Sequence, residues 1–244
     1  MATIAVYSLK GGVGKTTLAI NLAWASATRS ARRTLLWDLD PQAAATFLLG
    51  GDAGGRHPAQ AIFSKDVDAA KLIRATAIDR LALLPADTSL RQLDQFFHAL
   101  DKKKRLSRLL GDLAQDFDRI LLDCPPGLTE TSEQVMRAAD LIVVPVAPSP
   151  LSQRAFAEVA AHLVQRGAKV PLMPVHTMVD RRRKLHVEAV ARHPDWPVIP
   201  MASIVEAVAV RRAPVGAFAP RSTGARAFNA LWQAIEQTLA GRAR

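Results

Sequence analysis

Residues 10–17 read K-G-G-V-G-K-T-T, and this glycine-rich stretch constrains the fold more than any other part of the chain. It follows an apolar run at residues 3–7 that is typical of a buried strand, and it precedes a helical pattern over residues 16–28. In this context, glycines let backbone N–H groups converge on phosphate oxygens, and the helix start adds the positive end of its dipole. We therefore predict a phosphate-binding loop between the first strand and the first helix.

The loop carries more positive charge than a phosphate site usually requires. Lys15 is expected to neutralise the β- and γ-phosphates of ATP, and the Thr16 hydroxyl to bind Mg²⁺, which prefers oxygen ligands. The predicted nucleotide-binding residues of the loop are Gly11, Gly12, Val13, Gly14, Lys15, Thr16 and Thr17. The usual pattern G-x-x-x-x-G-K-[ST] also has an early glycine, but this chain has Leu9 there, followed by a second lysine, Lys10. That second lysine needs its own explanation.

Short apolar runs alternate with helical patterns through the rest of the chain. We predict strands at residues 34–37, 80–84, 119–122, 141–146 and 170–177, and helices at 106–113, 130–139, 152–165 and 226–239. The alternation favours an α/β fold of the P-loop NTPase type, a mostly parallel twisted sheet with helices on both faces. With 244 residues and no repeat or long linker, residues 1–244 are expected to form a single domain, in which G-G-D-A-G-G at 50–55 is a loop.

Three aspartates follow predicted strands. L-L-W-D-L-D-P-Q places Asp38 and Asp40 two positions apart, so both side chains would leave the same face of an extended segment. R-I-L-L-D-C-P-P places Asp123 at the end of an apolar run, as in a Walker B motif. In an open parallel sheet these strand ends converge beside the phosphate loop. A single strand-end aspartate often forms only a turn, but three beside such a loop favour a shared site.

The positive charge of the chain is concentrated toward its carboxyl terminus. The formal net charge is +10; residues 151–244 contain 14 Lys and Arg against 6 Asp and Glu, whereas residues 1–150 contain 18 against 16. This asymmetry indicates either a polyanionic partner, such as nucleic acid or an anionic membrane, or an arginine-rich solvated surface. The single cysteine, Cys124, excludes an internal disulfide or a multi-cysteine metal site within the chain.

Two features bear on membranes. The start M-A-T-I-A-V-Y-S lacks the features of a signal peptide and no apolar run is long enough to span a bilayer, so we expect a cytoplasmic protein. Residues 226–239 place apolar side chains on one helical face: Phe228, Leu231, Trp232, Ile235 and Leu239. Such a stripe either binds a membrane or packs on the sheet, and packing is the commoner case.

K-G-G-V-G-K-T-T, D-L-D-P-Q and L-L-D-C-P-P together resemble the ParA/MinD family of deviant Walker A ATPases, in particular its ParA branch. T-M-V-D-R-R at 177–182 and V-I-P at 198–200 extend this resemblance over nearly the whole chain. Because the chain starts at its first strand, it resembles members without the amino-terminal helix-turn-helix extension, and sequence-specific operator binding is not expected. The resemblance implies ATP and Mg²⁺ as cofactors.

The resemblance also explains the second lysine. In that family the first lysine of the loop, Lys10 here, crosses the interface of an ATP-sandwich dimer and contacts the nucleotide of the other subunit, much as an arginine finger does. The catalytic residues implied are Lys10, Lys15 and Asp40, of which Asp40 positions the attacking water. The implied magnesium shell is Thr16, Asp38 and Asp123, and Pro200 lies where the chain passes the adenine.

Two segments depart from the family pattern. The usual N-Q-K before the glycines is S-L-K here, which bears on nucleotide or interface contacts. The usual G-N-A-T after D-P-Q is A-A-A-T at 43–46, which bears on the switch that follows Asp40. Neither departure removes a phosphate, metal or water ligand.

The function that these features favour is a nucleotide-dependent switch. ATP would drive formation of a homodimer, which binds duplex DNA without sequence preference, and a ParB-like or other adaptor protein would stimulate hydrolysis. Such a protein is nucleoid-associated and positions a plasmid, a chromosome or a protein cluster. A MinD-like membrane-cycling ATPase and an ATP-dependent metabolic synthetase remain as alternatives, whereas a nitrogenase iron protein would need two cluster-ligating cysteines.

Basic residues in the carboxy-terminal part are the candidates for DNA contacts. The predicted set is Arg181, Arg182, Arg183, Lys184, Arg211, Arg212 and Arg221. A further basic run at 102–105, K-K-K-R, is expected to be only a solvated face. Few aromatic residues interleave with these charges, so stacking on single strands is not expected.

Overall fold

The structure, a computed structural model, describes residues 1–50, 57–64, 66–99 and 104–242, so most of the predicted 50–55 loop lies outside it. Its centre is an eight-stranded sheet in the order β3-β4-β2-β5-β1-β6-β7-β8. All neighbouring strands run parallel except β3, which pairs antiparallel with β4. The strands are β1 (Ala2–Val6), β2 (Thr34–Asp38), β3 (Arg74–Ala75), β4 (Leu81–Leu84), β5 (Arg119–Asp123), β6 (Leu141–Val146), β7 (Leu172–Val179) and β8 (Val198–Pro200).

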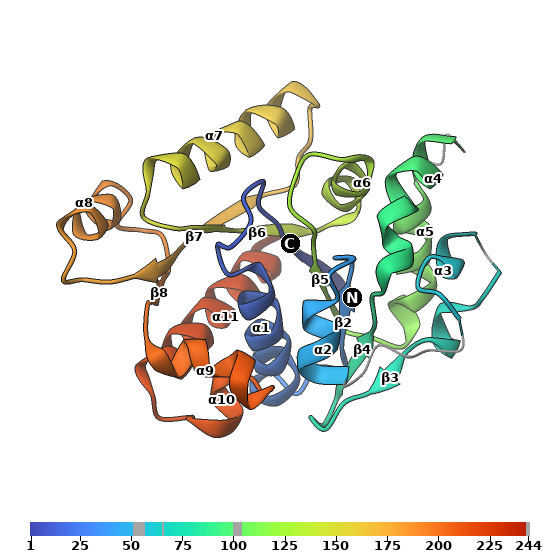
Figure 1. The fold of residues 1–244 in the computed structure, drawn as a ribbon, viewed down its shortest axis with the longest axis horizontal. Coiled ribbons are helices and arrows are strands. Elements are labelled where there is room, and N and C mark those ends of the chain that lie inside the picture. Colours follow the sequence, from blue (N-terminus) through green and yellow to red (C-terminus); the bar gives the residue numbers. More distant parts are fainter. Residues whose placement is uncertain (51–56, 65, 100–103, 243–244) are drawn as a thin grey trace.

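Helices cover both faces of this sheet (Figure 1). On one face lie α1 (Lys15–Arg29), α2 (Ala44–Gly50), α9 (Ser203–Arg211), α10 (Val215–Phe218) and α11 (Thr223–Arg242). On the other lie α3 (Ala61–Ser64), α4 (Leu93–Ala99), α5 (Arg105–Asp112), α6 (Glu130–Ala138) and α7 (Pro150–Gln165). The helix α8 (Lys184–Arg192) projects at the end of the molecule away from α3, α4 and α5. Short 3₁₀ turns occupy Ala69–Lys71, Thr88–Gln92 and Leu113–Gln115.

The central strands are apolar throughout because both of their faces are covered. In β1, Ile4 and Val6 pack into the core on the α1 side, whereas Ala5 and, just beyond the strand, Tyr7 pack into the core on the α6 side. The predicted fold class is therefore confirmed. Every predicted strand is present, and the largest shift is in β7, which begins at Leu172 instead of residue 170.

The amphipathic carboxy-terminal helix packs on the sheet. Phe228, Leu231, Trp232 and Ile235 of α11 are buried in the core shared with α1. The interpretation of this stripe as core packing is confirmed. Within the described ranges, none of the helices is long and apolar enough to cross a membrane.

The expectation that the basic run K-K-K-R at 102–105 is only a solvated face is wrong for Arg105. Lys102 and Lys103 lie outside the described residues and Lys104 is exposed, but Arg105 is only 5% exposed. Its Nε donates to the Phe63 carbonyl at 2.9 Å and its Nη2 to the Ile62 carbonyl at 2.7 Å. These carbonyls belong to α3, a helix of one turn whose C=O groups lack intrahelical partners. Arg105 supplies those partners, so it is a structural residue.

We predict that Arg105→Ala lowers the free energy of unfolding by about 2–4 kcal/mol, because two buried carbonyls lose their donors. Urea unfolding monitored by tryptophan fluorescence measures the change. Arg108→Ala, an exposed arginine on the same helix, is the control and should change stability by less than about 0.5 kcal/mol. Equal stability of the two variants would contradict the capping role.

Candidate nucleotide-binding site

The glycine-rich loop joins the end of β1 to the start of α1, as the sequence predicts. Gly12 and Gly14 have φ angles of 71° and 91°, a left-handed conformation that other residues adopt only with strain. The loop is anchored from the neighbouring part of the sheet, where the Thr177 hydroxyl of β7 donates to the Val13 carbonyl at 3.0 Å. Its backbone is therefore shaped before any ligand binds.

Lys15 is held inside the loop. The side chain is buried, with the whole residue only 8% exposed, and its Nζ donates to the Lys10 carbonyl at 3.1 Å. Burial lowers the pKa of Lys15, while the nearby carboxylates of Asp123 and Asp40 oppose this effect. The first residue of α1 therefore carries a poorly solvated cation at a helix start, which suits an anionic ligand.

Asp38, at the end of β2, is fully buried and already has hydrogen-bond partners. Its Oδ2 accepts from the Thr46 backbone N–H at 2.9 Å and from the Thr46 hydroxyl at 2.8 Å, and its Oδ1 accepts from the Asp40 N–H at 3.1 Å. Burial raises the pKa of Asp38 to about 6 against the effect of the Thr46 hydrogen bonds. Asp38 therefore ties the segment after β2 to the sheet.

Asp40 lies beyond the end of β2, in the turn that leads to α2. Its Oδ1 accepts from the Gln42 N–H at 2.9 Å and its carbonyl accepts from the Ala43 N–H at 2.8 Å. Because the strand ends at Asp38, the extended geometry that we expected does not reach Asp40. Asp40 remains partly exposed, near the ammonium of Lys15.

Asp123 is the unsatisfied carboxylate of the site. It ends β5, where it is the register partner of Asp38 in β2 and of Val6 in β1. Neither of its buried oxygens has a hydrogen-bond partner of good geometry among the described residues. Burial raises the pKa of Asp123 well above its usual value and the charge of Asp38 adds to this, although the Thr16 hydroxyl lies close enough to oppose the rise.

An unpartnered buried carboxylate beside Thr16 fits a magnesium site. Mg²⁺ keeps several waters and commonly takes only one or two carboxylates together with substrate phosphates. In the described part of the chain, His, Cys, Asp and Glu side chains form no group of three that could hold a metal ion by itself. The donor set therefore suits a magnesium ion that enters with a phosphate ligand, with Thr16 and Asp123 near it.

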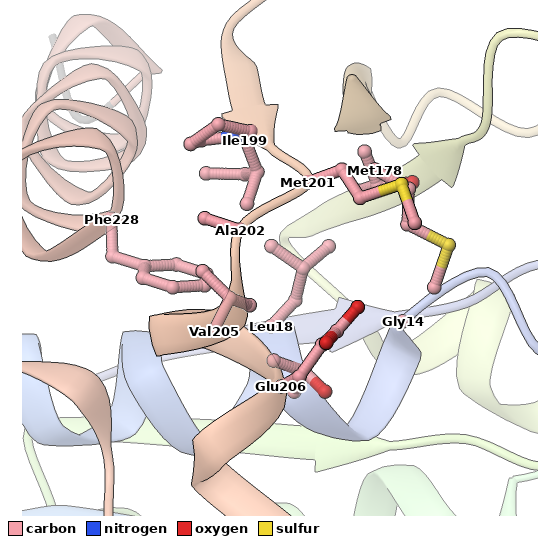
Figure 2. A pocket seen from close by; sticks show the side chains of 12 residues that line it. Gly14, Leu18, Met178, Ile199, Met201, Ala202, Val205, Glu206 and Phe228 are labelled. Atoms are coloured by element: carbon pink, nitrogen blue, oxygen red, sulfur yellow. The ribbon is translucent and has the colours of Figure 1, made fainter. Parts of the chain in front are cut away.

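A pocket of about 170 Å³ opens beside the phosphate loop (Figure 2). Met178 and Met201 lie on one side and the Phe228 ring on the other (Figure 2). The lining residues are Gly14, Thr17, Leu18, Thr177, Met178, Ile199, Pro200, Met201, Ala202, Val205, Glu206 and Phe228. A mostly apolar pocket next to a phosphate site can accommodate a flat base.

Pro200, which the sequence predicts beside the adenine, lines this pocket. Met178, Val205, Glu206 and Phe228 were not predicted from the sequence as pocket residues. Met178 belongs to the T-M-V-D stretch, and the other three residues follow the V-I-P stretch in the sequence. Nothing in the local sequence indicates that they meet, because tertiary packing brings them together.

Five non-glycine residues of the described ranges have positive φ, and three of them lie in segments connected to the site. Ala43 (φ 54°) precedes α2, Met178 (φ 56°) lies where the β7–β8 register shifts, and Arg212 (φ 49°) ends α9. This conformation costs a non-glycine residue roughly 1–2 kcal/mol, and such strain is often found at functional sites. Ala43 stands where the resembling family has the glycine of G-N-A-T. The departure therefore places alanine in a left-handed conformation that glycine adopts without strain.

The basic residues predicted to contact DNA form two groups. Arg181, Arg183 and Lys184 are exposed at the start of α8, where Arg182 is paired with Asp180 through bonds of 2.9 Å. The second group lies around the end of α9 and the start of α11 and consists of Arg211, Arg212 and Arg221. In this group, the Arg212 guanidinium donates to the carbonyl of Phe47, so its charge is already engaged.

The fold and the loop define an α/β nucleotide-binding protein of the P-loop type. The AAA domain family AAA_31 matches residues 1–170. The sporulation initiation inhibitor protein Soj of Bacillus subtilis is 30% identical over 239 residues, covering 92% of this chain and 94% of Soj. The chain therefore belongs to the ParA/MinD family of deviant Walker A ATPases, and it is an ATPase of the partitioning or positioning type.

Solved structures agree with this assignment. The Cyanothece McdA–ATP complex matches with a TM-score of 0.85 at 21% identity, covering 97% of this chain and 96% of McdA, and supports the fold. The cell division ATPase MinD of Pyrococcus furiosus matches at 0.81 and 25%, covering 97% and 99%. Cobyrinic acid a,c-diamide synthase of Mycobacterium smegmatis, with a bound ATP analogue and magnesium, matches at 0.83 and 26%, covering 97% and 94%. Nucleotide and magnesium binding are thus properties of this family.

We predict that Ala43→Gly raises the free energy of unfolding by about 0.5–1 kcal/mol. Relief of the left-handed strain outweighs the greater entropy that glycine gives to the unfolded chain. Ala45→Gly, two residues later within α2 and buried, should instead destabilise the protein by about 1 kcal/mol. Urea unfolding compares the two variants, and destabilisation by Ala43→Gly would show that the position is not strained.

Proposed function

We propose that the protein is an ATP-driven dimerising switch that binds DNA without sequence preference and positions or segregates a cargo. The observation that carries the proposal is the presence of two lysines at one phosphate loop. Lys15 is buried and bonded to the Lys10 carbonyl, whereas the Lys10 side chain forms no ion pair with any residue that the structure describes. One chain needs a single loop lysine for its own nucleotide, which leaves Lys10 to contact the nucleotide of a second copy.

Within one subunit, the proposed roles follow the geometry. Lys15 and the loop N–H groups hold the β- and γ-phosphates, and Thr16 and Asp123 lie where they can hold Mg²⁺, either directly or through its waters. Magnesium would supply charge neutralisation on the phosphates. Asp40, partly exposed near Lys15, orients the attacking water, and the pocket that includes Pro200 receives the adenine. Asp38 supports the magnesium shell from its bonds to Thr46 and Asp40.

The DNA surface is proposed from exposure and charge. The contacts that we propose are Arg181, Arg183, Lys184, Arg211 and Arg221, all exposed. Arg182 and Arg212 are left out, because Asp180 and Phe47 already engage their guanidinium groups. Formation of a dimer doubles the basic surface, so DNA affinity depends on ATP through multivalency. Such a protein is nucleoid-associated, and a ParB-like or other adaptor stimulates its hydrolysis.

The two alternatives make different demands on the chain. A membrane-cycling ATPase needs an amphipathic helix with an available apolar face, but the apolar face of α11 is buried against α1 and the sheet. A synthetase would turn over ATP only together with its small substrate. ATP hydrolysis by the purified protein without added metabolites therefore favours the switch.

Two loop variants test the phosphate site. Lys15→Ala should weaken ATP binding by about 100-fold or more, because the loop loses its central cation. Lys10→Ala should change ATP affinity of the monomer by less than about twofold and yet abolish ATP-dependent dimerisation or hydrolysis. Calorimetry, light scattering and phosphate release measure the three properties.

Lys104→Ala, which removes an exposed lysine far along the chain, is the control for these two variants. Wild-type ATP affinity of Lys15→Ala would overturn the phosphate-site assignment. A Lys10→Ala protein that dimerises and hydrolyses ATP normally would overturn the role of Lys10 across the interface.

For the DNA surface we predict that Arg183→Ala with Lys184→Ala weakens ATP-dependent binding to unrelated duplexes equally. Each lost phosphate contact lowers the log–log salt slope by roughly 0.9. Fluorescence anisotropy at several salt concentrations measures the slope, and light scattering checks that dimerisation is intact. Lys104→Ala with Arg108→Ala removes the same charge elsewhere and should leave the slope unchanged. An equal loss in both double variants would indicate a general effect of charge instead of a defined surface.

A further inference from the structure

Arg212 joins two helices that approach the candidate nucleotide site from different parts of the chain. It follows α9, and its guanidinium reaches Phe47 in α2. Nη2 and Nε donate to the Phe47 carbonyl at 2.6 and 3.1 Å, and the guanidinium carbon lies 4.3 Å from the centroid of the Phe47 ring. The contact therefore combines a forked hydrogen bond with stacking, for which arginine is well suited.

On the α2 side, this contact acts on the segment that carries the aspartates. The helix has seven residues, so its last four carbonyls, beginning at Phe47, lack intrahelical partners, and Arg212 supplies one. The Phe47 N–H bonds to the carbonyl of Ala43, whose own N–H bonds to Asp40. The adjacent Thr46 holds the Asp38 carboxylate. Asp38 is fixed in β2, so the position of α2 acts on Asp40, in the turn between the strand and the helix.

On the α9 side, the contact holds a helix that lines the pocket proposed for the adenine, the base pocket. Val205 and Glu206 of α9 line that pocket, nearly two turns before Arg212. Arg212 itself has φ 49° and ψ 44°, the left-handed conformation that glycine usually provides after a helix. This conformation is strained for arginine, so the surrounding structure must stabilise it. The bonds from its side chain to Phe47 are part of that stabilisation.

We propose that Arg212 is a positioning residue for ATP hydrolysis, because it fixes α2 against α9 and so sets Asp40, in the turn before α2, relative to the base pocket. The proposal rests on the assignment of the nucleotide to this site. Arg212 is not one of the residues that line the pocket, so loss of its side chain acts on the chemical step more than on binding.

Arg212→Gly tests this role, because glycine keeps the left-handed backbone and removes only the side chain. We expect kcat to fall about 3- to 10-fold, which corresponds to the loss of roughly one hydrogen bond's stabilisation, while KM and the Kd for ADP change by less than about twofold. The melting temperature should stay the same or rise slightly. Arg212→Lys, which keeps a cation over the Phe47 ring, should recover part of kcat.

Arg80→Gly is a matched control in the turn before β4. Arg80 also has a positive φ, 61°, and also donates to a carbonyl, that of Ala31 at 2.9 Å. This variant should leave kcat and KM unchanged. Wild-type kcat in Arg212→Gly would overturn the proposal, and so would a parallel loss of kcat, ADP affinity and melting temperature, which indicates a purely structural role. Absence of ATP and ADP binding by the wild-type protein would instead overturn the nucleotide assignment itself.

Discussion

The site depends on how the protein offsets the energetic cost of burying two carboxylates side by side. Asp38 and Asp123 are register partners on the adjacent parallel strands β2 and β5, and both are fully enclosed. Burial and mutual repulsion disfavour the ionised form of each. The two residues are compensated differently: Thr46 donates twice to Asp38, whereas the groups of the described chain that oppose the burial of Asp123 are the nearby Thr16 hydroxyl and Lys15 ammonium. A magnesium ion that enters with the phosphates would complete the compensation at Asp123.

Left-handed backbone conformations occur in three segments connected to the site. Ala43, Met178 and Arg212 each adopt a left-handed conformation, and they precede α2, line the base pocket and end α9, respectively. Such conformations persist only where the surroundings enforce them. The packing around α2, the pocket and α9 therefore has to hold these three residues in place.

Much of the fold follows from short-range pattern, because the central strands are apolar and each is followed by a helix. The loop glycines and the three aspartates could also be located, since parallel strands bring their carboxyl ends together whatever the details of packing. The base pocket was predicted only at Pro200, because Val205 and Phe228 reach it through the docking of α9 and α11. Arg105 and Arg212 look like surface charges in the sequence. Their partners, the carbonyls of α3 and α2, are 42 and 165 residues away, beyond any local pattern.

The Arg212 contact joins two parts of the chain that lie far apart in the sequence. The AAA domain family matches residues 1–170, which contain the loop, Asp40 and Asp123. The base pocket takes Met178, Pro200 and Phe228 from beyond that segment, where the positive charge of the chain is also concentrated. A bound nucleotide would bridge the two parts, with its phosphates on the first and its base on the second. Among the described residues, the polar side-chain contacts that link the two parts include Thr177 to Val13, Arg212 to Phe47, and Asn21, whose carboxamide oxygen accepts from the Val215 N–H at 2.8 Å. The first fixes the phosphate loop and the second fixes the segment after Asp40, so the two contacts together allow the occupied base pocket to influence both phosphate binding and the chemical step.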